Sequence, residues 1–343
     1  MSAVTPLLDE LSGADCWHQD GLPALSLCLS GEQVTELAAR AAILEAAVSP
    51  KPGLVCLGSN GAHSDMDYPL FVRSAKALRP YFAQAHALGE TTRDLSPGQV
   101  FARLRPLGVW AEQCMLQATG GINTHKGLIF SMGLFCAAVG RLNNGMAGQV
   151  VSALALRQAA ASFVSGIVRR DFAPLAEHKA AQRGTLRCGV MGGLSPRDAR
   201  PVFEAQLQRA LTAGEVLYLL YGVTGIRGEA EQGFPHVGLA LQALEAHGAA
   251  HDLNTAMAHC LLELVQAMDD TNILWRGGPE GLRHAASSAR AVLAAGGLGT
   301  HVGQAALRRM SVDFARKRLS PGGCADILAV SVFLWLLRCH GTG

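Results

Sequence analysis

The sequence lacks three features that would each point to a whole class of proteins. No run of Lys and Arg residues occurs, and a formal net charge of +2 provides no strong field for nucleic-acid binding. The longest uncharged apolar runs, 127–140 and 327–337, are shorter than the ~20 residues that a membrane-spanning helix needs. The first basic residue is Arg40, so the chain starts without the positive segment of a secretory signal or the arginines of a transit peptide. We therefore expect a cytoplasmic protein that binds neither nucleic acid nor a membrane.

Paired cysteines are also missing. The nine cysteines are scattered singly, at positions 16, 28, 56, 114, 136, 188, 260, 324 and 339, and no C-x-x-C pair occurs. An odd, dispersed set is typical of small buried side chains in a reducing compartment, rather than of disulfides or zinc ligands. With 343 residues, 49% of them hydrophobic, the chain can bury a sizeable core.

Runs of β-branched residues with a period of two are nearly absent, whereas alanine and leucine dominate. We predict an all-α fold in a single large multi-helix domain. Residues 1–30 are expected to form an N-terminal extension, partly ordered at best, and residues 31–343 the all-helical catalytic domain.

Capping and breaking residues place the helices. Ser30 and Gln33 form a capping-box signature, and Pro50 and Pro52 end the helix that follows. An apolar helix is expected to end near residue 142, another to begin at Pro235, and 171–194 to be less regular. The remaining helices are predicted at 69–88, 96–119 (broken or bent near residue 106), 146–170, 196–221, 251–268, 279–295, 300–318 and 323–339.

The segment 120–130 carries the first candidate site. A glycine-flexible loop brings an amide, a hydroxyl, an imidazole and an ammonium group directly before a long apolar helix. Asn123 or Thr124 can cap that helix. His125 and Lys126 then put basic groups at the positive end of the helix dipole, where acids are preferred. Such a lysine is often only a solvated surface residue, but the density of polar groups here favours an anion site.

Acidic residues gather in the other polar loops. Asp65 and Asp67 lie close together before Pro69, where one of them is expected to cap a helix; two carboxylates on a short loop also suit Mg²⁺. Asp269 and Asp270 follow an apolar helix, either as a solvated helix end or as a second group of metal ligands.

Arginines and glycines accompany these acids. Arg276 precedes two glycines and could reach a phosphate or pair with the acids nearby. The loop 222–228 contains Arg227, but it follows no strand and lacks the lysine-serine/threonine ending of a P-loop. Asp326, in the first turn of the last helix, is interpreted as a cap. Together, these residues indicate a helical enzyme acting on a nucleotide or polyphosphate with a divalent ion, although their spacing names no reaction.

Six motifs in the same order resemble those of the triphosphoribosyl-dephospho-coenzyme A synthases, and they span about residues 32–340. They are SPKPGLV (49–55), GAHSDMD (61–67), GINTHKG (121–127), GIRGEA (225–230), DTN with RGG (270–272 and 276–278) and SPGGCAD (320–326). The resemblance implies an all-α transferase that joins ATP to 3′-dephospho-CoA and releases adenine. Its product would be the precursor of the acyl carrier prosthetic group of citrate lyase or malonate decarboxylase, and a downstream carrier-protein transferase would be a partner.

One position favours the malonate decarboxylase branch. Citrate-type members usually carry an acid directly after the Gly-Leu-Val step, where this chain has Cys56. Lys126, where the malonate branch often has arginine, weakly favours the other branch.

The implied reaction assigns hypothetical roles. The 2′-hydroxyl of dephospho-CoA attacks the anomeric carbon of the ATP ribose, and the triphosphate is gripped rather than cleaved. The proposed catalytic residues are Glu45, as the base, and Asp67. The proposed ATP and phosphate ligands are Lys51, Asn123, His125, Lys126, Arg227 and Arg276. The proposed Mg²⁺ ligands are Asp65, Asp67, Asp269 and Asp270.

Two other functions fit the same residues. A helical, Mg²⁺-dependent hydrolase that cleaves the N-glycosidic bond of a nucleotide such as ADP-ribose would use the same acids and phosphate ligands. A non-catalytic helical adaptor for a carrier protein is the third hypothesis.

Overall fold

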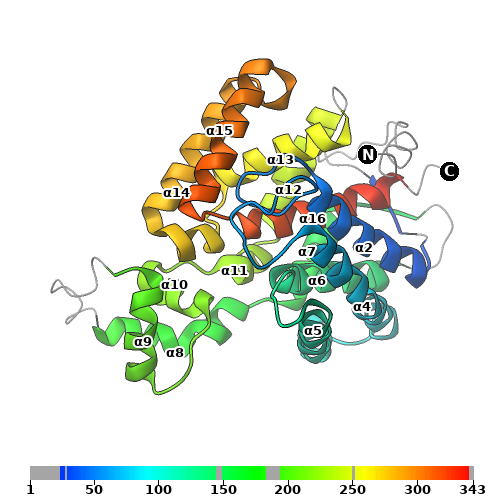
Figure 1. The fold of residues 1–343 in the computed structure, drawn as a ribbon. Helices are drawn as coiled ribbons and strands as arrows, with labels where there is room; N and C mark the ends of the chain where they lie inside the picture. Colours follow the sequence, from blue (N-terminus) through cyan, green and yellow to red (C-terminus); the bar gives the residue numbers. More distant parts are fainter. Residues whose placement is uncertain (1–23, 28, 144–148, 183–193, 249–251, 340–343) are drawn as a thin grey trace.

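Helices form nearly all of the computed structural model, which describes residues 24–27, 29–143, 149–182, 194–248 and 252–339 (Figure 1). The all-α prediction is confirmed, because the strands of the described residues are one short antiparallel pair, β1 (Ala24–Ser26) with β2 (Val150–Ser152). Most of the predicted N-terminal extension lies outside the described residues. Its last part packs into the core, where Leu25, Leu27 and Leu29 are buried.

The first helices are α2 (Gly31–Ala47), α3 (Tyr68–Ala77), α4 (Arg79–Thr91), α5 (Pro97–Thr119), α6 (Lys126–Leu142), α7 (Ala153–Phe163), α8 (Ile167–Gln182) and α9 (Pro196–Leu207). They are followed by α10 (Ala213–Tyr221), α11 (Gly225–Glu231), α12 (Pro235–Gly248), α13 (Leu253–Ala267), α14 (Thr271–Ala294), the 3₁₀ turn η1 (Gly297–Gly299), α15 (His301–Lys317) and α16 (Gly322–Cys339).

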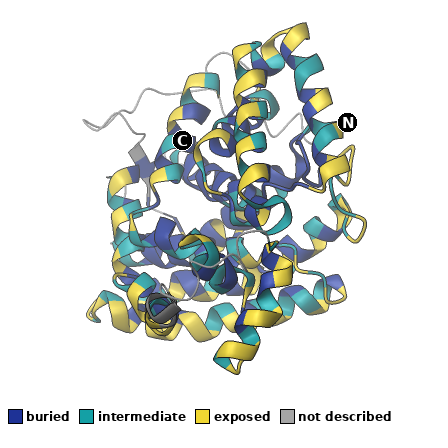
Figure 2. Cartoon of the chain, turned by 90° about the vertical axis from the view of Figure 1, so that its left-hand side faces the viewer, coloured by how far each residue is buried: buried dark blue, intermediate teal, exposed yellow. Residues whose placement is uncertain are grey.

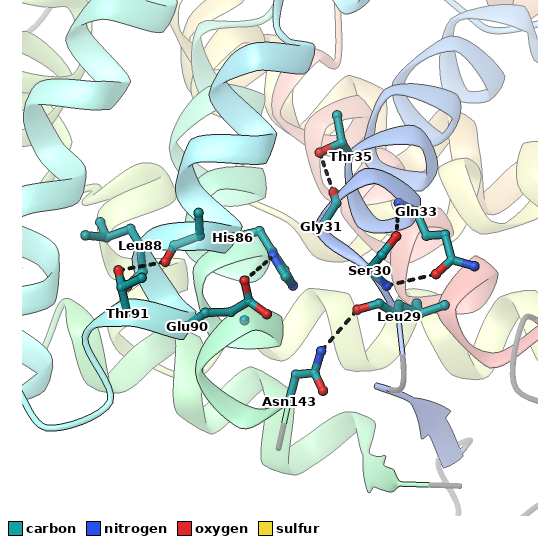
Figure 3. A network of polar contacts seen from close by, with 12 residues as sticks. Leu29, Ser30, Gly31, Gln33, Thr35, His86, Leu88, Glu90, Thr91 and Asn143 are labelled. Atoms are coloured by element: carbon teal, nitrogen blue, oxygen red, sulfur yellow. Dashed lines mark hydrogen bonds and ion pairs between the residues drawn. The ribbon is translucent and has the colours of Figure 1, made fainter. Parts of the chain in front are cut away.

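The predicted capping box at the start of α2 is confirmed. The Ser30 hydroxyl accepts from the Gln33 N–H (3.2 Å), and the Gln33 side chain accepts from the Ser30 N–H (2.8 Å). The Asn143 side-chain amide, at the end of α6, donates to the Leu29 carbonyl (3.1 Å) (Figure 3). This bond joins the segment before α2 to the end of α6. The capping residues thus fix both the start of α2 and its place beside α6.

Several predicted helix boundaries were wrong. The segment 69–88 is two helices that meet at Leu78, because Pro80 has no N–H and its ring clashes with the preceding turn. The segment 196–221 is likewise two helices, and Gln208 ends the first of them with a left-handed φ of 50°. In contrast, α5 continues through Pro106, so the helix predicted to be broken or bent there is not broken. The helix predicted to begin at Pro279 does begin there: within α14, the non-helical Gly278 (φ 60°) separates it from a preceding helical segment that starts at Thr271.

Two further segments differ from the predicted pattern. Part of 146–170 lies outside the described residues, and the rest is β2, then α7, then the start of α8, with Gly166 at φ 74° between the helices. The segment 171–194, expected to be less regular, is helical as far as Gln182, where α8 ends.

The main core is built around α6, which packs against α4, α7 and α16. Buried residues fill the middle of the molecule and exposed residues line its outer helices (Figure 2). Glycines let α4 and α6 approach closely: a Cβ at Gly89 would collide with the Ala137 carbonyl, and one at Gly140 with the His86 carbonyl. Backbone contact of this kind leaves no room for any side chain at the crossing.

A second, smaller core holds α8, α9 and α10 together. Its buried members are Phe172, Leu175, Ala199, Phe203, Leu211, Val216 and Leu219. These three helices project from the rest of the molecule in Figure 1 and touch it through α11 and α14. No helix among the described residues combines the length and hydrophobicity needed to cross a membrane.

The close helix crossing gives the first prediction. Gly89→Ala should lower the free energy of unfolding by about 1–3 kcal/mol, because its methyl group would push α4 away from α6. Gly98→Ala in α5, where an added Cβ meets nothing within 4 Å, should be neutral or stabilising by up to ~1 kcal/mol. Urea unfolding of both variants measures the difference, and equal stabilities would contradict the proposed crossing.

Candidate active site

Two cavities meet at the start of α6. The small cavity has a volume of about 240 Å³ and the large cavity about 1020 Å³. Asn123, Lys126, Gly127, Asn272 and Asp326 line both of them. Because the cavities share a wall from the α6 start, α14 and α16, a ligand in one lies next to a ligand in the other.

The small cavity collects most of the residues that the sequence singled out. Segments more than 200 positions apart in the chain supply them, and the predicted members are Glu45, Lys51, Asn123, His125, Lys126 and Arg276. Three of the other predicted residues, Arg227, Asp269 and Asp270, line the large cavity instead. Asp65 and Asp67 line neither cavity.

Lys51 and Glu45 form a buried ion pair. The Lys51 Nζ donates to the Glu45 carbonyl (2.5 Å) and to its Oε1 (2.6 Å). Both side chains are almost fully buried, and a buried charge is tolerated only when it is paired. Two of the three ammonium donors are thus committed to Glu45, and Glu45 compensates the charge of a buried lysine. This use competes with the predicted role of Glu45 as the base.

His125 is buried and neutral. Burial, and secondarily the nearby Lys51 charge, lowers its pKa from 6.5 to about 3. Its Nδ1 lies 2.7 Å from the Ser74 hydroxyl, and its Nε2 has no hydrogen-bond partner among the described residues. The sequence-based view of His125 as a cation at the helix start is therefore wrong: it enters the small cavity as a neutral imidazole.

Asn123, in the loop before α6, and Lys126, the first residue of α6, have different roles. The side-chain Oδ1 of Asn123 accepts from the Lys126 backbone N–H (3.2 Å), so Asn123 rather than Thr124 supplies the side-chain acceptor at the helix start. The Lys126 ammonium forms an ion pair with Glu112 on α5, and its side chain is half exposed. Lys126 can therefore exchange Glu112 for a ligand anion at little cost, because exposed ion pairs are weak.

Arg276 is held at the cavity by a histidine. Its Nη2 donates to His63 Nδ1 (3.5 Å), and its Nη1 donates to the Arg318 carbonyl (3.3 Å). His63 Nε2 lies 3.0 Å from the Ser320 hydroxyl. Burial and then the Arg276 charge lower the pKa of His63, which keeps it neutral and able to accept from the guanidinium.

Asp65 and Asp67 lie outside the cavities. Asp67 is exposed and caps α3, where its Oδ1 accepts from the Leu70 N–H (2.8 Å). Asp65 is also exposed and lies 3.8 Å from His63 Nδ1. The position of Asp67 is explained by capping, the alternative considered from the sequence.

Asp270 is fully engaged in structure. Its Oδ1 accepts from the N–H groups of Asn272 (2.8 Å) and Ile273 (3.0 Å), and its Oδ2 accepts from Cys324 N–H (2.8 Å). Burial raises its pKa, although these three donors oppose the shift. Asp269, its neighbour, is exposed and lines the large cavity.

The predicted metal ligands are not gathered into one site. Asp65 and Asp67 belong to the loop before α3, whereas Asp269 and Asp270 belong to the large cavity. In the part of the chain that the structure describes, no three His, Cys, Asp or Glu side chains are placed to hold a metal ion. The Mg²⁺ site proposed from the sequence therefore stays a prediction.

Arg227 lines the large cavity, where its guanidinium already forms an ion pair. Its Nε donates to Asp171 Oδ2 (2.7 Å), and its guanidinium lies over the Phe172 ring, 5.5 Å from the centroid. These contacts anchor α11 to α8 and hold the guanidinium in place, with the side chain about one-third exposed.

Asp326 is the site residue that sequence reasoning missed. It is the fifth residue of α16, beyond the capping positions, and it lines both cavities. Burial, followed by the carboxylates of Glu45 and Asp270, raises its pKa well above the usual range. Gly127 lies so close that a Cβ there would collide with the carboxyl group. The only sequence signal was its place at the end of the SPGGCAD motif.

Comparisons with known proteins identify the family of this chain. The model of a family described as ATP:dephospho-CoA triphosphoribosyl transferase matches residues 31–342. The chain is 37% identical over 316 residues to the probable 2-(5″-triphosphoribosyl)-3′-dephosphocoenzyme-A synthase of Salmonella gallinarum, covering 91% of this chain and 93% of the relative. It is 36% identical to the synthase of Klebsiella pneumoniae (89% and 91% covered) and 37% identical to that of Haemophilus ducreyi (90% and 90%).

The neutral state of His125 predicts a pH dependence of stability. Because its pKa is about 3 in the folded protein, against an ordinary value of 6.5 for an exposed histidine, the unfolded chain binds more protons between these values. The free energy of unfolding should therefore fall as the pH falls from 6.5 towards 3, by up to about 1.4 kcal/mol per pH unit for this group. The slope should be shallower by that amount in His125→Gln and unchanged in His301→Gln, which alters an exposed histidine. Urea titrations at pH 4 to 7 measure it; equal slopes for His125→Gln and wild type would refute the neutral assignment.

Proposed function

Since the chain belongs to the ATP:dephospho-CoA triphosphoribosyl transferase family, we propose that it joins ATP to 3′-dephospho-CoA and releases adenine. The product is 2′-(5″-triphosphoribosyl)-3′-dephospho-CoA. The observation that carries the proposal is the shared wall of the two cavities, where a carboxyl group of raised pKa lies between a cavity with cationic groups and a larger one. A transfer between two nucleotides needs two adjoining binding spaces with a proton acceptor where they meet.

The chemistry assigns Asp326 as the base. The acceptor 2′-hydroxyl forms the new bond to the anomeric carbon of the ATP ribose as the bond to adenine breaks, and the hydroxyl proton passes to a carboxylate. In its ionised form, Asp326 is a stronger proton acceptor than an exposed carboxylate, because its pKa is raised, and its negative charge stabilises the oxocarbenium character of the ribose. Neither Glu45, which holds Lys51, nor Asp67, which caps α3, lies at the junction of the two cavities.

We place the triphosphate in the small cavity because cationic groups line it. Lys51, Lys126 and Arg276 line it, with Asn123 and the neutral His125 as further donors. The large cavity is of the size that binds extended ligands, and we place dephospho-CoA there, with Arg227 on its wall. The reacting ribose then lies at the shared wall, beside Asp326.

Mg²⁺ would enter with ATP. This ion takes one or two carboxylates and completes its shell with water and substrate phosphates, so a dedicated protein cage is not needed. Asp269, exposed on the large cavity, could supply one such carboxylate, whereas Asp270 has donors on both of its oxygens and Asp326 is assigned to the proton transfer. When bound, the ion would neutralise part of the triphosphate charge.

We assign the product to the malonate decarboxylase branch, where a downstream carrier-protein transferase would receive it. The supporting residue is Cys56, which is buried beside Ser49 in place of the acid that is usual in citrate-type members. The genes that neighbour this one would test the assignment, because citrate lyase or malonate decarboxylase subunits would be encoded there.

Adenine release tests the function. With Mg-ATP and dephospho-CoA, we expect adenine to appear in a one-to-one ratio with the triphosphoribosylated product, measured by liquid chromatography. Without dephospho-CoA, little adenine should form. Release of adenine together with free ribose triphosphate in that control would instead identify an N-glycosidic hydrolase.

Asp326→Asn should lower kcat by about 100-fold or more while leaving the Kd for Mg-ATP nearly unchanged, because only the proton acceptor is removed. Asp67→Asn is the matched control, since asparagine caps a helix as well as aspartate. We expect its kcat to stay within about twofold of the wild type. Steady-state kinetics and titration calorimetry measure both; a large loss in Asp67→Asn with full activity in Asp326→Asn would reverse the assignment.

A further inference from the structure

We infer that Ser74 and Thr124 fix the tautomer of His125, so that its Nε2–H points into the small cavity as an uncharged donor to a substrate oxygen. Neither hydroxyl belongs to the predicted site, and both act through the imidazole as positioning residues. The identity of the substrate oxygen rests on the proposed function, whereas the tautomer rests on the geometry alone.

Three groups form a short relay. The Thr124 hydroxyl donates to the Ser74 Oγ (2.6 Å), and the Ser74 Oγ lies 2.7 Å from His125 Nδ1. A serine hydroxyl has one proton and two acceptor lone pairs. In the described structure the Ser74 Oγ contacts only Thr124, which donates to it, and Nδ1, so its proton is directed to Nδ1. Nδ1 is then the acceptor of the ring, and the one proton of the neutral imidazole is on Nε2.

Nε2 is the atom that the fold leaves for a ligand. His125 is only 3% exposed, it lines the small cavity, and its Nε2 has no hydrogen-bond partner in the described structure. A buried donor without a partner costs ~1–3 kcal/mol, and a ligand oxygen in the cavity would remove that cost.

Neighbouring side chains also fix the position of the His125 residue. Phe71 packs its ring edge-on against the imidazole, 5.0 Å between centroids, and the backbone N–H of His125 donates to the Met115 sulfur (3.2 Å). Phe71 and Ser74 both lie on α3, which begins at the Asp67 cap. The GAHSDMD motif therefore ends on the residue that starts the helix carrying these two contacts.

A neutral donor suits this position. Lys51 and Glu45 already form an ion pair on the same cavity, and a second cation beside Lys51 would repel it. Burial and the Lys51 charge both oppose protonation of His125. The imidazole can therefore hold a phosphate oxygen of ATP without giving up a proton to it.

The tautomer itself can be measured without substrate. In the wild-type protein, the ¹⁵N and ¹³C shifts of His125 should report a proton on Nε2 at pH 7. In Ser74→Ala, the relay is lost and the signals should move towards a mixture of tautomers. A wild-type proton on Nδ1 would overturn the inference, whatever the protein catalyses.

Ligand binding provides the second test, with Mg-ATP as the probe. Ser74→Ala should weaken binding by about tenfold, the loss of one hydrogen bond to a charged group. Ser331→Ala removes an equally buried helix hydroxyl that bonds to Ile327 in the core, and its affinity should match that of the wild type. Ser74→Cys keeps the size of the side chain and replaces Ser74→Ala if that variant is poorly folded. It should also weaken binding.

A double-mutant cycle separates positioning from packing. If Ser74 acts through the imidazole, Ser74→Ala should cause no further loss of affinity in a His125→Gln background. Additive losses would show that Ser74 supports the fold rather than the tautomer, and would overturn the inference. If the wild-type protein binds no Mg-ATP, the proposed function fails, while the tautomer measurement still decides the relay.

Discussion

The carboxylate of Asp270 is the contact on which the candidate site depends. The first turn of every helix leaves N–H groups without partners and carries a partial positive charge. Asp270 serves two such turns at once, that of α14 and that of α16. Gly323 keeps this contact possible, because a Cβ there would approach to 3.0 Å from Oδ2. With both helices started at one point, α14 brings Arg276 to the small cavity and α16 brings Asp326 to the junction of the cavities.

The same residue type therefore has two different roles in the lining of the large cavity. Asp270 is buried, but three N–H donors satisfy it, and further change in its charge would loosen two helices. Asp326 is also desolvated, yet among the described residues only the backbone N–H of Leu128 opposes the rise of its pKa, while two carboxylates act against its ionisation. With so little compensation, the Asp326 carboxyl group binds a proton more tightly than an exposed aspartate does. The difference in donors, rather than in burial, separates the structural acid from the proposed catalytic one.

The sequence alone was sufficient for the fold class and for the segments that form the site. The lack of period-two patterning predicted an all-α chain, and the capping box at Ser30 gave a correct helix start. Polar loops between apolar helices identified the residues that surround the small cavity. Local signals could not show whether a carboxylate caps a helix or faces a cavity, which is why Asp67 was assigned chemistry and Asp326 a capping role. That distinction depends on which other helices lie nearby, and this is settled by packing over more than 200 residues.

The basic groups at the start of α6 also show that local sequence signals do not reveal the environment of a side chain. Their sign conflicts with the helix dipole, and the sequence suggested that a bound anion resolves the conflict. Within the protein, burial makes His125 neutral and Glu112 pairs with Lys126, so no anion is needed to explain the helix. The case for a ligand therefore rests on different ground: an imidazole nitrogen buried without a partner, a lysine whose exposed ion pair is easily exchanged, and a carboxyl group shared by two cavities. One phosphorylated ligand that fills the small cavity and reaches the shared wall would contact all three.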